Sequence, residues 1–173
     1  MNEVAFPSPN FQERDPGSLI TRIILHDTES SAKEALAWLS TTPADRKKQT
    51  GVESYSSTHV LIDKLGIIYR LVPDSKKAWG CKGHNTNSLQ IELEMLKTDP
   101  DGTFTPEQLA ASAEWCAEKC IEYRIPLNRI VSHASLDPAR RTDPRGFDFY
   151  EFLLEVASWV DKKEAESNGG ADL

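Results

Sequence analysis

One short stretch of the chain, residues 132–144, gathers an imidazole, two carboxylates and two guanidiniums: His133, Asp137, Asp143, Arg140 and Arg141. A proline follows each aspartate, and proline restricts both its own backbone and that of the residue before it. Stiff loops that follow strands are common places for catalytic and binding residues. The same residues would also suit a salt-bridged surface loop, so the stretch alone leaves both interpretations open.

A second histidine, His26, stands in a comparable place earlier in the chain. The apolar, β-branched run 19–25 is typical of a strand buried on both faces, and His26 follows it directly, as His133 follows the run 129–132. If these strands are neighbours, their carboxyl ends place both imidazoles at the sheet edge where open α/β sheets bind ligands. Two imidazoles and one carboxylate, here Asp143, form a donor set suited to catalytic zinc. Each histidine taken alone is more often a hydrogen-bonded structural residue.

A metal-activated water also needs a proton acceptor and a group that stabilises negative charge. Residues 88–94 alternate apolar and polar side chains, which puts Glu92 and Glu94 on one face of a predicted strand. A carboxylate among isoleucine and leucine is costly to bury without a task, and Glu92 is nearer the asparagine-rich loop, so we favour Glu92 as the base. A solvent-exposed edge strand is the alternative. Three further candidates are Arg141 for stabilising negative charge and Asp27 and Asp137 for orienting the imidazoles.

The remaining patterns predict a single α/β domain with a central mixed β-sheet flanked by α-helices. Two β-rich runs, 58–63 and 67–72, join through a glycine-containing turn and predict an antiparallel hairpin. Capping residues and helical spacing predict helices at about 32–40, 105–125 and 147–160. The other segments are an irregular arm packed on the domain (1–18), a polar loop (43–54) and a flexible tail (162–173), which leaves 19–161 as the catalytic domain.

Composition excludes several classes of protein. The 173 residues fit one domain, with the 39% apolar and 27% charged content of a soluble globular protein. A net charge of −7 with scattered lysines and arginines argues against a nucleic-acid surface. No apolar run reaches the ~20 residues that cross a bilayer, and no signal peptide is visible. Three cysteines do not suggest a disulfide framework; Cys116 and Cys120 fit the inner face of a helix, and the role of Cys81 stays open.

Several motifs in chain order carry a resemblance to a known family: Ile23 to His26, Ser57 to His59, Ala78-Trp79, Asn87 to Glu92, Ser132-His133 and Arg141 to Pro144. Together they are similar to the type 2 N-acetylmuramoyl-L-alanine amidases. That family includes phage lysozyme-amidases, bacterial muropeptide amidases and peptidoglycan-recognition proteins. The resemblance runs from about residue 7 to residue 160 and implies the mixed α/β fold of the family.

Carried over residue by residue, the resemblance implies one Zn²⁺ held by His26, His133 and Asp143. It implies that Glu92 is the catalytic acid or base. Arg141 stands where the family often has lysine, so the cation is kept in a planar form. Without the resemblance, Arg141 would equally suit a surface ion pair. The residues expected to contact substrate are His59, Trp79, His84, Asn85 and Asn87.

Three positions depart from the family pattern. Thr58 replaces a tyrosine beside the hairpin histidine and cannot supply a phenol, so we expect it only to support the site while proton transfer rests on Glu92. Gly80 replaces the histidine of the usual Ala-Trp-His motif, and whether His84 takes its place stays open. Gln90 replaces a common glycine and is expected to narrow the groove.

The expected activity is zinc-dependent hydrolysis of the amide bond between N-acetylmuramic acid and L-alanine, by a monomer whose partner is peptidoglycan or a muropeptide and not nucleic acid. We favour a phage or prophage endolysin, made in the cytoplasm and acting on the cell wall after release, because the segment between His26 and His59 is short. A cytoplasmic muropeptide-recycling amidase suits an acidic single domain equally well. A non-catalytic peptidoglycan-recognition module is less favoured, because such members usually lose the third ligand and Asp143 is present. A metal-free hydrolase would leave the two histidines without a shared purpose.

Overall fold

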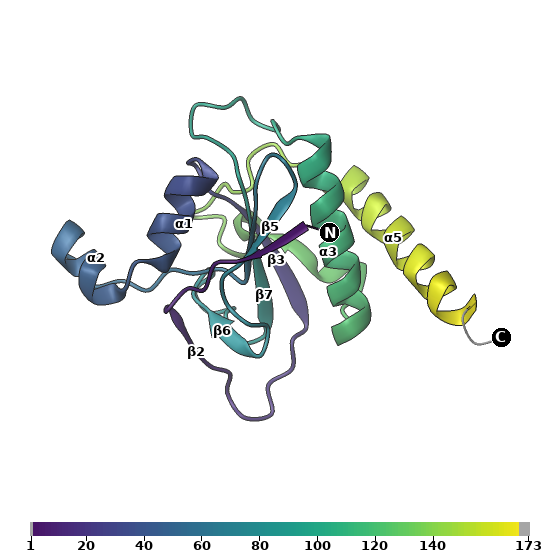
Figure 1. Cartoon of the computed structure of the whole chain (residues 1–173), viewed down its shortest axis with the longest axis horizontal. Coiled ribbons are helices and arrows are strands. Elements are labelled where there is room, and N and C mark those ends of the chain that lie inside the picture. Colours follow the sequence, from purple (N-terminus) through teal and green to yellow (C-terminus); the bar gives the residue numbers. More distant parts are fainter. Residues whose placement is uncertain (1, 170–173) are drawn as a thin grey trace.

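A six-stranded β-sheet forms the centre of the domain in the computed structural model, which describes residues 2–169 (Figure 1). Across the sheet the strands follow the order β1-β5-β4-β7-β3-β8. Strand β3 therefore lies between β7 and β8, and these three strands carry or precede most of the candidate site residues. The strand bounds are Asn2–Ala5 (β1), Arg22–Asp27 (β3), Val60–Ile62 (β4), Ile67–Arg70 (β5), Ser88–Leu93 (β7) and Ile130–Ser132 (β8).

The sheet is mixed, as the sequence predicts. Strand β3 pairs in parallel with β7 and with β8, whereas β4 and β5 form the predicted antiparallel hairpin. Gly66 closes this hairpin with a φ of 75°, which glycine adopts at little cost, and a Cβ there would lie 2.7 Å from the carbonyl oxygen of Glu107. Side chains on both faces of the central strands are buried, which explains their unbroken apolar runs.

Helices α1 (Ala32–Ser40) and α2 (Pro43–Thr50) lie on one side of the sheet (Figure 1). Helix α1 begins with the predicted capping box. The prediction of a loop over 43–54 was wrong for the residues of α2. Thr42 caps this helix, a proline is its first residue and Gly51 ends it in a left-handed conformation, so the Thr-Pro pair that stops α1 also starts α2.

The N-terminal arm is more regular than predicted. Strand β1 extends the sheet in parallel with β5, and β2 (Phe11–Glu13) pairs antiparallel with β6 (Lys76–Ala78) in a small second sheet. The buried side chains of Ser8 and Asn10 donate hydrogen bonds to backbone carbonyls at the end of α1. Pro7 and Pro9 lie between the two strands of the arm and Pro16 follows the second, so none of them interrupts the pairing, and the expectation of an irregular arm was wrong.

The longer helices α3 (Pro106–Tyr123) and α5 (Phe149–Gly169) pack side by side on the opposite side of the sheet (Figure 1). The main hydrophobic core lies between this helix pair and the strands. Trp115 is its largest fully buried side chain, and Cys116 and Cys120 are small core residues, as predicted. A short 3-10 helix, η1 (Leu127–Arg129), connects α3 to β8.

Helix α5 continues nine residues beyond its predicted end at 160, so residues 162–169 are helical rather than part of a flexible tail. Lys163 forms ion pairs with Glu114 and Glu118 of α3 at 3.2 and 2.9 Å, which hold this extension against the neighbouring helix. The rest of the expected tail, residues 170–173, lies outside the described residues. Within residues 2–169, no helix has both the length and the apolar character that crossing a membrane requires.

Candidate metal centre and catalytic cavity

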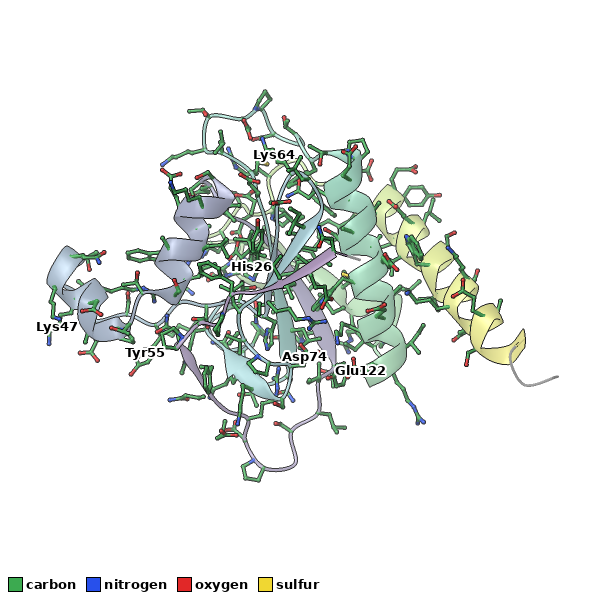
Figure 2. The ribbon with its side chains drawn as sticks, in the orientation of Figure 1. His26, Lys47, Tyr55, Lys64, Asp74 and Glu122 are labelled. Atoms are coloured by element: carbon green, nitrogen blue, oxygen red, sulfur yellow. The ribbon has the colours of Figure 1, made fainter. Side chains whose placement is uncertain are left out.

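The three predicted metal ligands meet at the carboxyl edge of the sheet, near the centre of the molecule where Figure 2 labels His26. His26 lies at the end of β3, and His133 begins the short helix α4 (His133–Leu136) directly after β8. Because Leu25 and Ser132 are paired in the parallel β3–β8 ladder, the two histidines that follow them emerge at the same level. Asp143 comes from the loop after α4.

The ligand atoms of these residues form a triangle with equal sides. The Nδ1 atoms of His26 and His133 lie 3.0 Å apart, and each lies 3.0 Å from Oδ2 of Asp143. Tetrahedral ligands at about 2.0–2.1 Å from zinc are roughly 3.3 Å from one another, so the triangle has nearly the size of one face of such a site. Three electron-rich atoms at this spacing repel unless a proton or a cation lies among them. The donor set and its spacing therefore fit Zn²⁺.

Electrostatics within the triad also favour a cation. Burial raises the pKa of Asp143, but hydrogen bonds with the two imidazoles outweigh burial and hold that pKa well below its usual range. Burial lowers the pKa of His133, yet hydrogen bonds with Asp143 and with the thiol of Cys81 outweigh it and raise the pKa to about 9. A metal ion binds only a deprotonated ring nitrogen, so a cation bound here would release any proton held on that nitrogen of His133. The buried Cys81, whose role the sequence leaves open, thus lies beside a candidate ligand.

The residues that support the triad differ from those predicted. Gln90, fully buried on β7, accepts a hydrogen bond from His26 Nε2 at 2.7 Å instead of narrowing the groove. Asp27 reaches no imidazole; it accepts a hydrogen bond from the backbone N–H of Arg145 at 2.8 Å and so anchors the loop that carries the third ligand. Thr58 donates to the carbonyl of Gln90 at 2.8 Å, and thus supports that strand from within the sheet.

Glu92 lies next to the triad. It is the neighbour of His26 in the parallel β3–β7 register and lines the same cavity. Its Oε2 atom is buried and has no hydrogen-bond partner among residues 2–169. Burial, followed by the negative charges of Asp143 and Asp27, raises the pKa of Glu92 well above its ordinary value. A partnerless carboxyl with a raised pKa beside a candidate metal site has the properties of a catalytic base.

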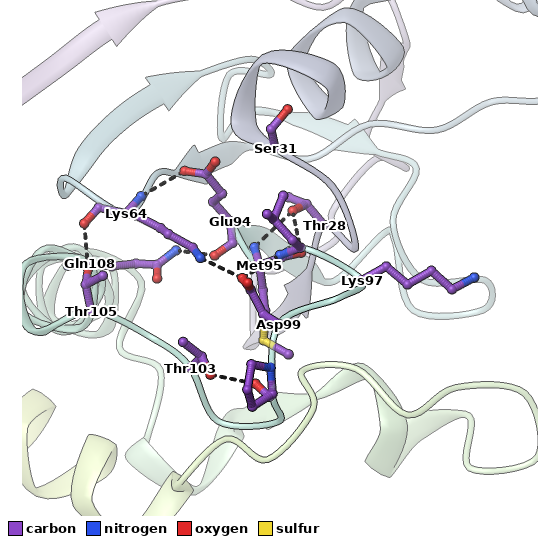
Figure 3. A network of polar contacts seen from close by, with 12 residues as sticks. Thr28, Ser31, Lys64, Glu94, Met95, Lys97, Asp99, Thr103, Thr105 and Gln108 are labelled. Atoms are coloured by element: carbon purple, nitrogen blue, oxygen red, sulfur yellow. Dashed lines mark hydrogen bonds and ion pairs between the residues drawn. The ribbon is translucent and has the colours of Figure 1, made fainter.

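Glu94 has a structural task instead. Its carboxylate accepts hydrogen bonds from the backbone N–H of Ala32, at the start of α1, and from that of Lys64, at 2.9 and 3.0 Å. Figure 3 shows Glu94 within the polar network that joins the β4–β5 turn to the start of α3. A negative charge at the N-terminus of α1 also stabilises that helix. The geometry therefore favours Glu92 over Glu94 as the base, as the sequence does.

A cavity of about 520 Å³ opens in front of the triad. Arg141 lines it, as a group that stabilises negative charge must, whereas Asp137 pairs with Arg140 and not with an imidazole. Trp38 of α1 lines another part of the cavity and is 38% exposed. The guanidinium of buried Arg46 covers the indole ring at 4.7 Å and donates to the backbone carbonyl of Trp38, so this aromatic wall is held in place.

The five residues predicted to contact substrate do not line the cavity. His59 is fully buried, and its Nδ1 accepts a hydrogen bond from the N–H of Gln90 at 2.9 Å while Nε2 contacts the carbonyl of Lys76 at 3.1 Å. Burial lowers the pKa of His59 to about 4, so it is a neutral structural residue. The prediction for His59 was wrong because the hairpin turns this side chain into the sheet, away from the cavity.

The other four residues lie in the loop between β6 and β7, and their contacts with substrate stay predictions. Trp79 packs on Tyr55 at a ring distance of 5.3 Å, and Asn85 accepts hydrogen bonds from the backbone N–H groups of residues 80 and 81. His84 lies 3.1 Å from the Arg22 guanidinium, and Asn87 donates to the carbonyl of Leu19. The loop is therefore tied to the strands behind the site, and of its residues only Gly80 lines the cavity. The imidazole of His84 is not among the groups that line the cavity.

The sequence does not predict Trp38 as a residue of the site, and it predicts a different role for Gln90. Trp38 sits beside the apolar stripe of α1, so spacing alone assigns it to the core. Gln90 carried a usable signal, because a long polar side chain in the middle of a buried strand requires partners. Its partner could not be found without the strand order, which places Gln90 diagonally across from His26.

This fold and site define a class: single α/β domains with three convergent candidate metal ligands beside a partly buried glutamate at the carboxyl edge of a mixed sheet. The family model described as N-acetylmuramoyl-L-alanine amidase matches residues 16–146, which include all three ligands and Glu92. The chain belongs to this family. None of the curated proteins matches the sequence.

Solved structures agree in fold. The protein in a crystal structure of an AmpD derivative is 25% identical in sequence to this chain, with a TM-score of 0.72. The match covers 89% of this chain and 93% of the AmpD chain. The amidase LysC from Clostridium intestinale is 21% identical with a TM-score of 0.62, covering 91% of this chain and 98% of its own. The E. coli amidase AmiD, in complex with anhydro-N-acetylmuramic acid-L-Ala-D-γ-Glu-L-Lys, is 20% identical with a TM-score of 0.65, covering 84% and 65%.

Proposed function

We propose that the protein is a zinc-dependent N-acetylmuramoyl-L-alanine amidase, which hydrolyses the amide bond between the lactyl group of N-acetylmuramic acid and L-alanine in peptidoglycan. One observation carries the proposal: three candidate ligand atoms, each 3.0 Å from the other two, converge beside the carboxyl of Glu92, whose Oε2 atom is buried and has no hydrogen-bond partner among residues 2–169. One Zn²⁺ per chain, held by His26, His133 and Asp143, would polarise the scissile carbonyl and increase the acidity of a water molecule.

Glu92 is the group that moves protons in this proposal. Its raised pKa brings it closer to neutrality, and a base whose pKa lies near the working pH both accepts and releases protons readily. Glu92 takes a proton from the attacking water and passes it to the leaving amine of L-alanine. Arg141, at the cavity wall, stabilises the negative charge that develops on the carbonyl oxygen.

The walls of the cavity suggest how the substrate lies in it. The scissile amide joins a sugar to a peptide whose glutamyl residue carries a carboxylate. Trp38 offers an aromatic face, and aromatic faces suit the apolar faces of sugar rings, whereas Arg140 and Arg141 offer cations that suit carboxylates. We therefore place the muramic acid toward α1 and the stem peptide toward the loop 140–142.

We also propose cell-wall peptidoglycan as the natural substrate, as for a phage or prophage endolysin that is made in the cytoplasm and acts as a monomer after release. The similarity to the endolysin amidase LysCS from Clostridium intestinale, which is 21% identical to this chain with a TM-score of 0.61, supports this role by fold alone. A cytoplasmic muropeptide-recycling amidase is the second candidate, and the AmiD complex with a soluble anhydromuropeptide supports it. Rates on intact sacculi and on a purified anhydromuropeptide separate the two, because an endolysin must act on the polymer.

The activity itself is tested by metal analysis together with product analysis on purified peptidoglycan, with His133→Ala as the control. We expect one zinc per chain, new L-alanine amino termini and no new reducing ends; the control loses both zinc and product. New reducing ends would indicate a glycosidase. Zinc without cleavage, but with binding to sacculi, would indicate a non-catalytic recognition module. Cleavage without zinc would indicate a metal-free hydrolase.

A further inference from the structure

A chain of three hydrogen bonds, two of them buried and the first partly buried, leads from a loop carbonyl to His26. The hydroxyl of Ser88 donates to the carbonyl of His84 at 2.7 Å, Nε2 of Gln90 lies 2.6 Å from Ser88 Oγ, and His26 Nε2 lies 2.7 Å from Oε1 of Gln90. Ser88 and Gln90 are fully buried and His26 is 3% exposed, so water does not compete for these groups. The three bonds are short and mutually dependent.

In each of these three hydrogen bonds, only one assignment of donor and acceptor is possible. A backbone carbonyl only accepts, so the one proton of the Ser88 hydroxyl is donated to His84. The Ser88 oxygen must then accept from the amide nitrogen of Gln90, which turns the amide oxygen of Gln90 toward His26. Because that oxygen also only accepts, His26 Nε2 carries a proton, so Nδ1 is the nitrogen that keeps its lone pair in the neutral imidazole, the form that can bind a metal. Nδ1 is the atom that faces His133 and Asp143.

The space for this arrangement exists because residue 80 is a glycine. A Cβ at Gly80 would lie 2.7 Å from Oε1 and 3.0 Å from Cδ of Gln90. Asn85 accepts hydrogen bonds from the N–H groups of Gly80 and Cys81, at 3.2 and 2.8 Å, so the loop cannot easily move away. Gly80 is not among the residues with positive φ, so backbone conformation does not require glycine here. Glycine is required at position 80 because the Gln90 amide occupies the space that a side chain would fill.

We propose that Gln90 is the positioning residue that fixes His26 as an Nδ1 metal ligand, and that Gly80 and Gln90 form a matched pair in which residue 80 gives up its side chain to the amide from β7. Both positions depart from the family pattern, and the two departures then depend on each other: the side chain missing at position 80 leaves room for the side chain present at position 90. The inference rests on the proposed zinc function, because it concerns how a ligand is prepared for the metal. Outer hydrogen-bond partners of this kind typically contribute 10–100-fold to metal affinity.

The first test compares Gln90→Leu, which keeps the size of the side chain but removes the acceptor, with Gln90→Glu, which keeps the acceptor. Nitrogen-15 NMR of the metal-free proteins reports the tautomer of His26, and competition with a chelator reports zinc affinity. We expect the wild type and Gln90→Glu to hold the Nε2–H tautomer. Gln90→Leu should show both tautomers and bind zinc roughly 10–100-fold more weakly. Ser88→Ala, which leaves the amide free to flip, is a milder variant should Gln90→Leu fold poorly, and it should shift both readouts in the same direction.

The second test is a double-mutant cycle between positions 80 and 90. Gly80→Ala in the wild type should weaken zinc binding about as much as Gln90→Leu does, because the new methyl group displaces the amide. In a Gln90→Ala background the same Gly80→Ala change should have no effect, since the space is then free. Equal effects of Gly80→Ala in both backgrounds would overturn the pairing.

The positioning role is overturned if Gln90→Leu retains a single Nε2–H tautomer, or if its zinc affinity stays within about threefold of the wild type. Failure of the proposed function looks different. A wild-type protein that binds no zinc refutes the zinc amidase, but the tautomer of His26 in the metal-free protein still tests the hydrogen-bond chain. The thermal midpoint of each variant separates a lost hydrogen bond from a lost fold.

Discussion

Two histidines on either side of β7 have nearly the same surroundings and opposite uses. His26 is 3% exposed and His59 is 0% exposed. Both bond to Gln90, His26 through the amide oxygen of its side chain and His59 through its backbone N–H. They differ in what the second nitrogen meets. Nδ1 of His26 faces two further ligand atoms at the cavity, whereas Nε2 of His59 is 3.1 Å from the carbonyl of Lys76.

The comparison shows that burial and residue type do not identify a functional histidine. The deciding feature is whether the second ring nitrogen is directed at a hydrogen-bond acceptor or at other lone pairs. The carbonyl of Lys76 accepts the proton on Nε2 of His59, so this nitrogen is not available to bind a metal. The lone pair of His26 meets two others, and only a proton or a metal ion can reconcile the three.

The largest effect is expected from substituting the two histidines. His26→Ala should reduce zinc from one per chain to near zero and lower the rate of amide hydrolysis by roughly 10³-fold or more, because water activation and carbonyl polarisation are lost together. His59→Asn, which keeps an acceptor for the N–H of Gln90, should retain zinc and most of the activity. Metal analysis and product release measure both. Zinc loss in the folded His59 variant alone would reverse the assignment of the two histidines.

The next effect in size concerns the glutamates that share a face of β7. Glu92→Gln should keep zinc but lower kcat by about 10²–10⁴-fold, since proton transfer to and from water is lost. Glu94→Gln is the matched control, and it should keep its activity while losing about 1 kcal/mol of stability, because it weakens the start of α1. Single-turnover rates and thermal unfolding separate the two outcomes. Near-normal turnover by Glu92→Gln would refute its role as the base.

Sequence patterns predict this fold well where a local signal sets it. The buried strands, the hairpin and the capping box of α1 follow from short stretches of the chain. The ligand set also follows, because both histidines come at the ends of apolar runs and parallel pairing brings such ends together. Missed elements have weaker signals: β1 and β2 are short edge strands without apolar alternation, and Thr42 serves as the end of one helix and the start of the next.

The rest of the site depends on which way a side chain points, and spacing cannot give that. His59 and Trp79 lie in motifs typical of the family, yet the hairpin and the β6–β7 loop turn both away from the cavity. Asp27 adjoins a ligand in sequence, but its carboxylate lies nearer the backbone of Arg145. Contacts with Gln90 depend on a strand order that no local pattern encodes.

A smaller expected effect is the contribution of His59 to the pH dependence of stability. Burial lowers the pKa of His59 to about 4, against 6.5 for an ordinary histidine, so the folded protein takes up this proton only at lower pH than the unfolded chain does. Stability from this residue is complete above pH 6.5 and is lost as the pH falls from 6.5 toward 4. The loss should total about 3 kcal/mol. His59→Asn should flatten the dependence of unfolding free energy on pH in that range, measured by urea denaturation.

The control for this measurement is His84→Asn, which removes a partly exposed imidazole at the surface. Burial and the Arg22 guanidinium also lower the pKa of His84, but this imidazole is partly exposed, so the His84 variant should flatten the curve much less than the His59 variant does. If both variants flatten the curve equally, the neutral buried state of His59 is not its source. Metal-free protein is used throughout, so that zinc release does not add its own dependence on pH.

The smallest effect tests the same principle on two tryptophans. Trp38 lines the cavity and is held by Arg46, whereas Trp79, the one that the sequence selects, packs on Tyr55 outside it. We expect Trp38→Ala to raise KM about 10-fold for a muramyl peptide with little change in kcat, as the loss of one stacking contact worth about 1–1.5 kcal/mol would do. Trp79→Ala should leave KM nearly unchanged in folded protein. A larger rise in KM for Trp79→Ala than for Trp38→Ala would place the sugar over the β6–β7 loop. Trp79 would then contact substrate, although its side chain, like that of His59, points away from the cavity.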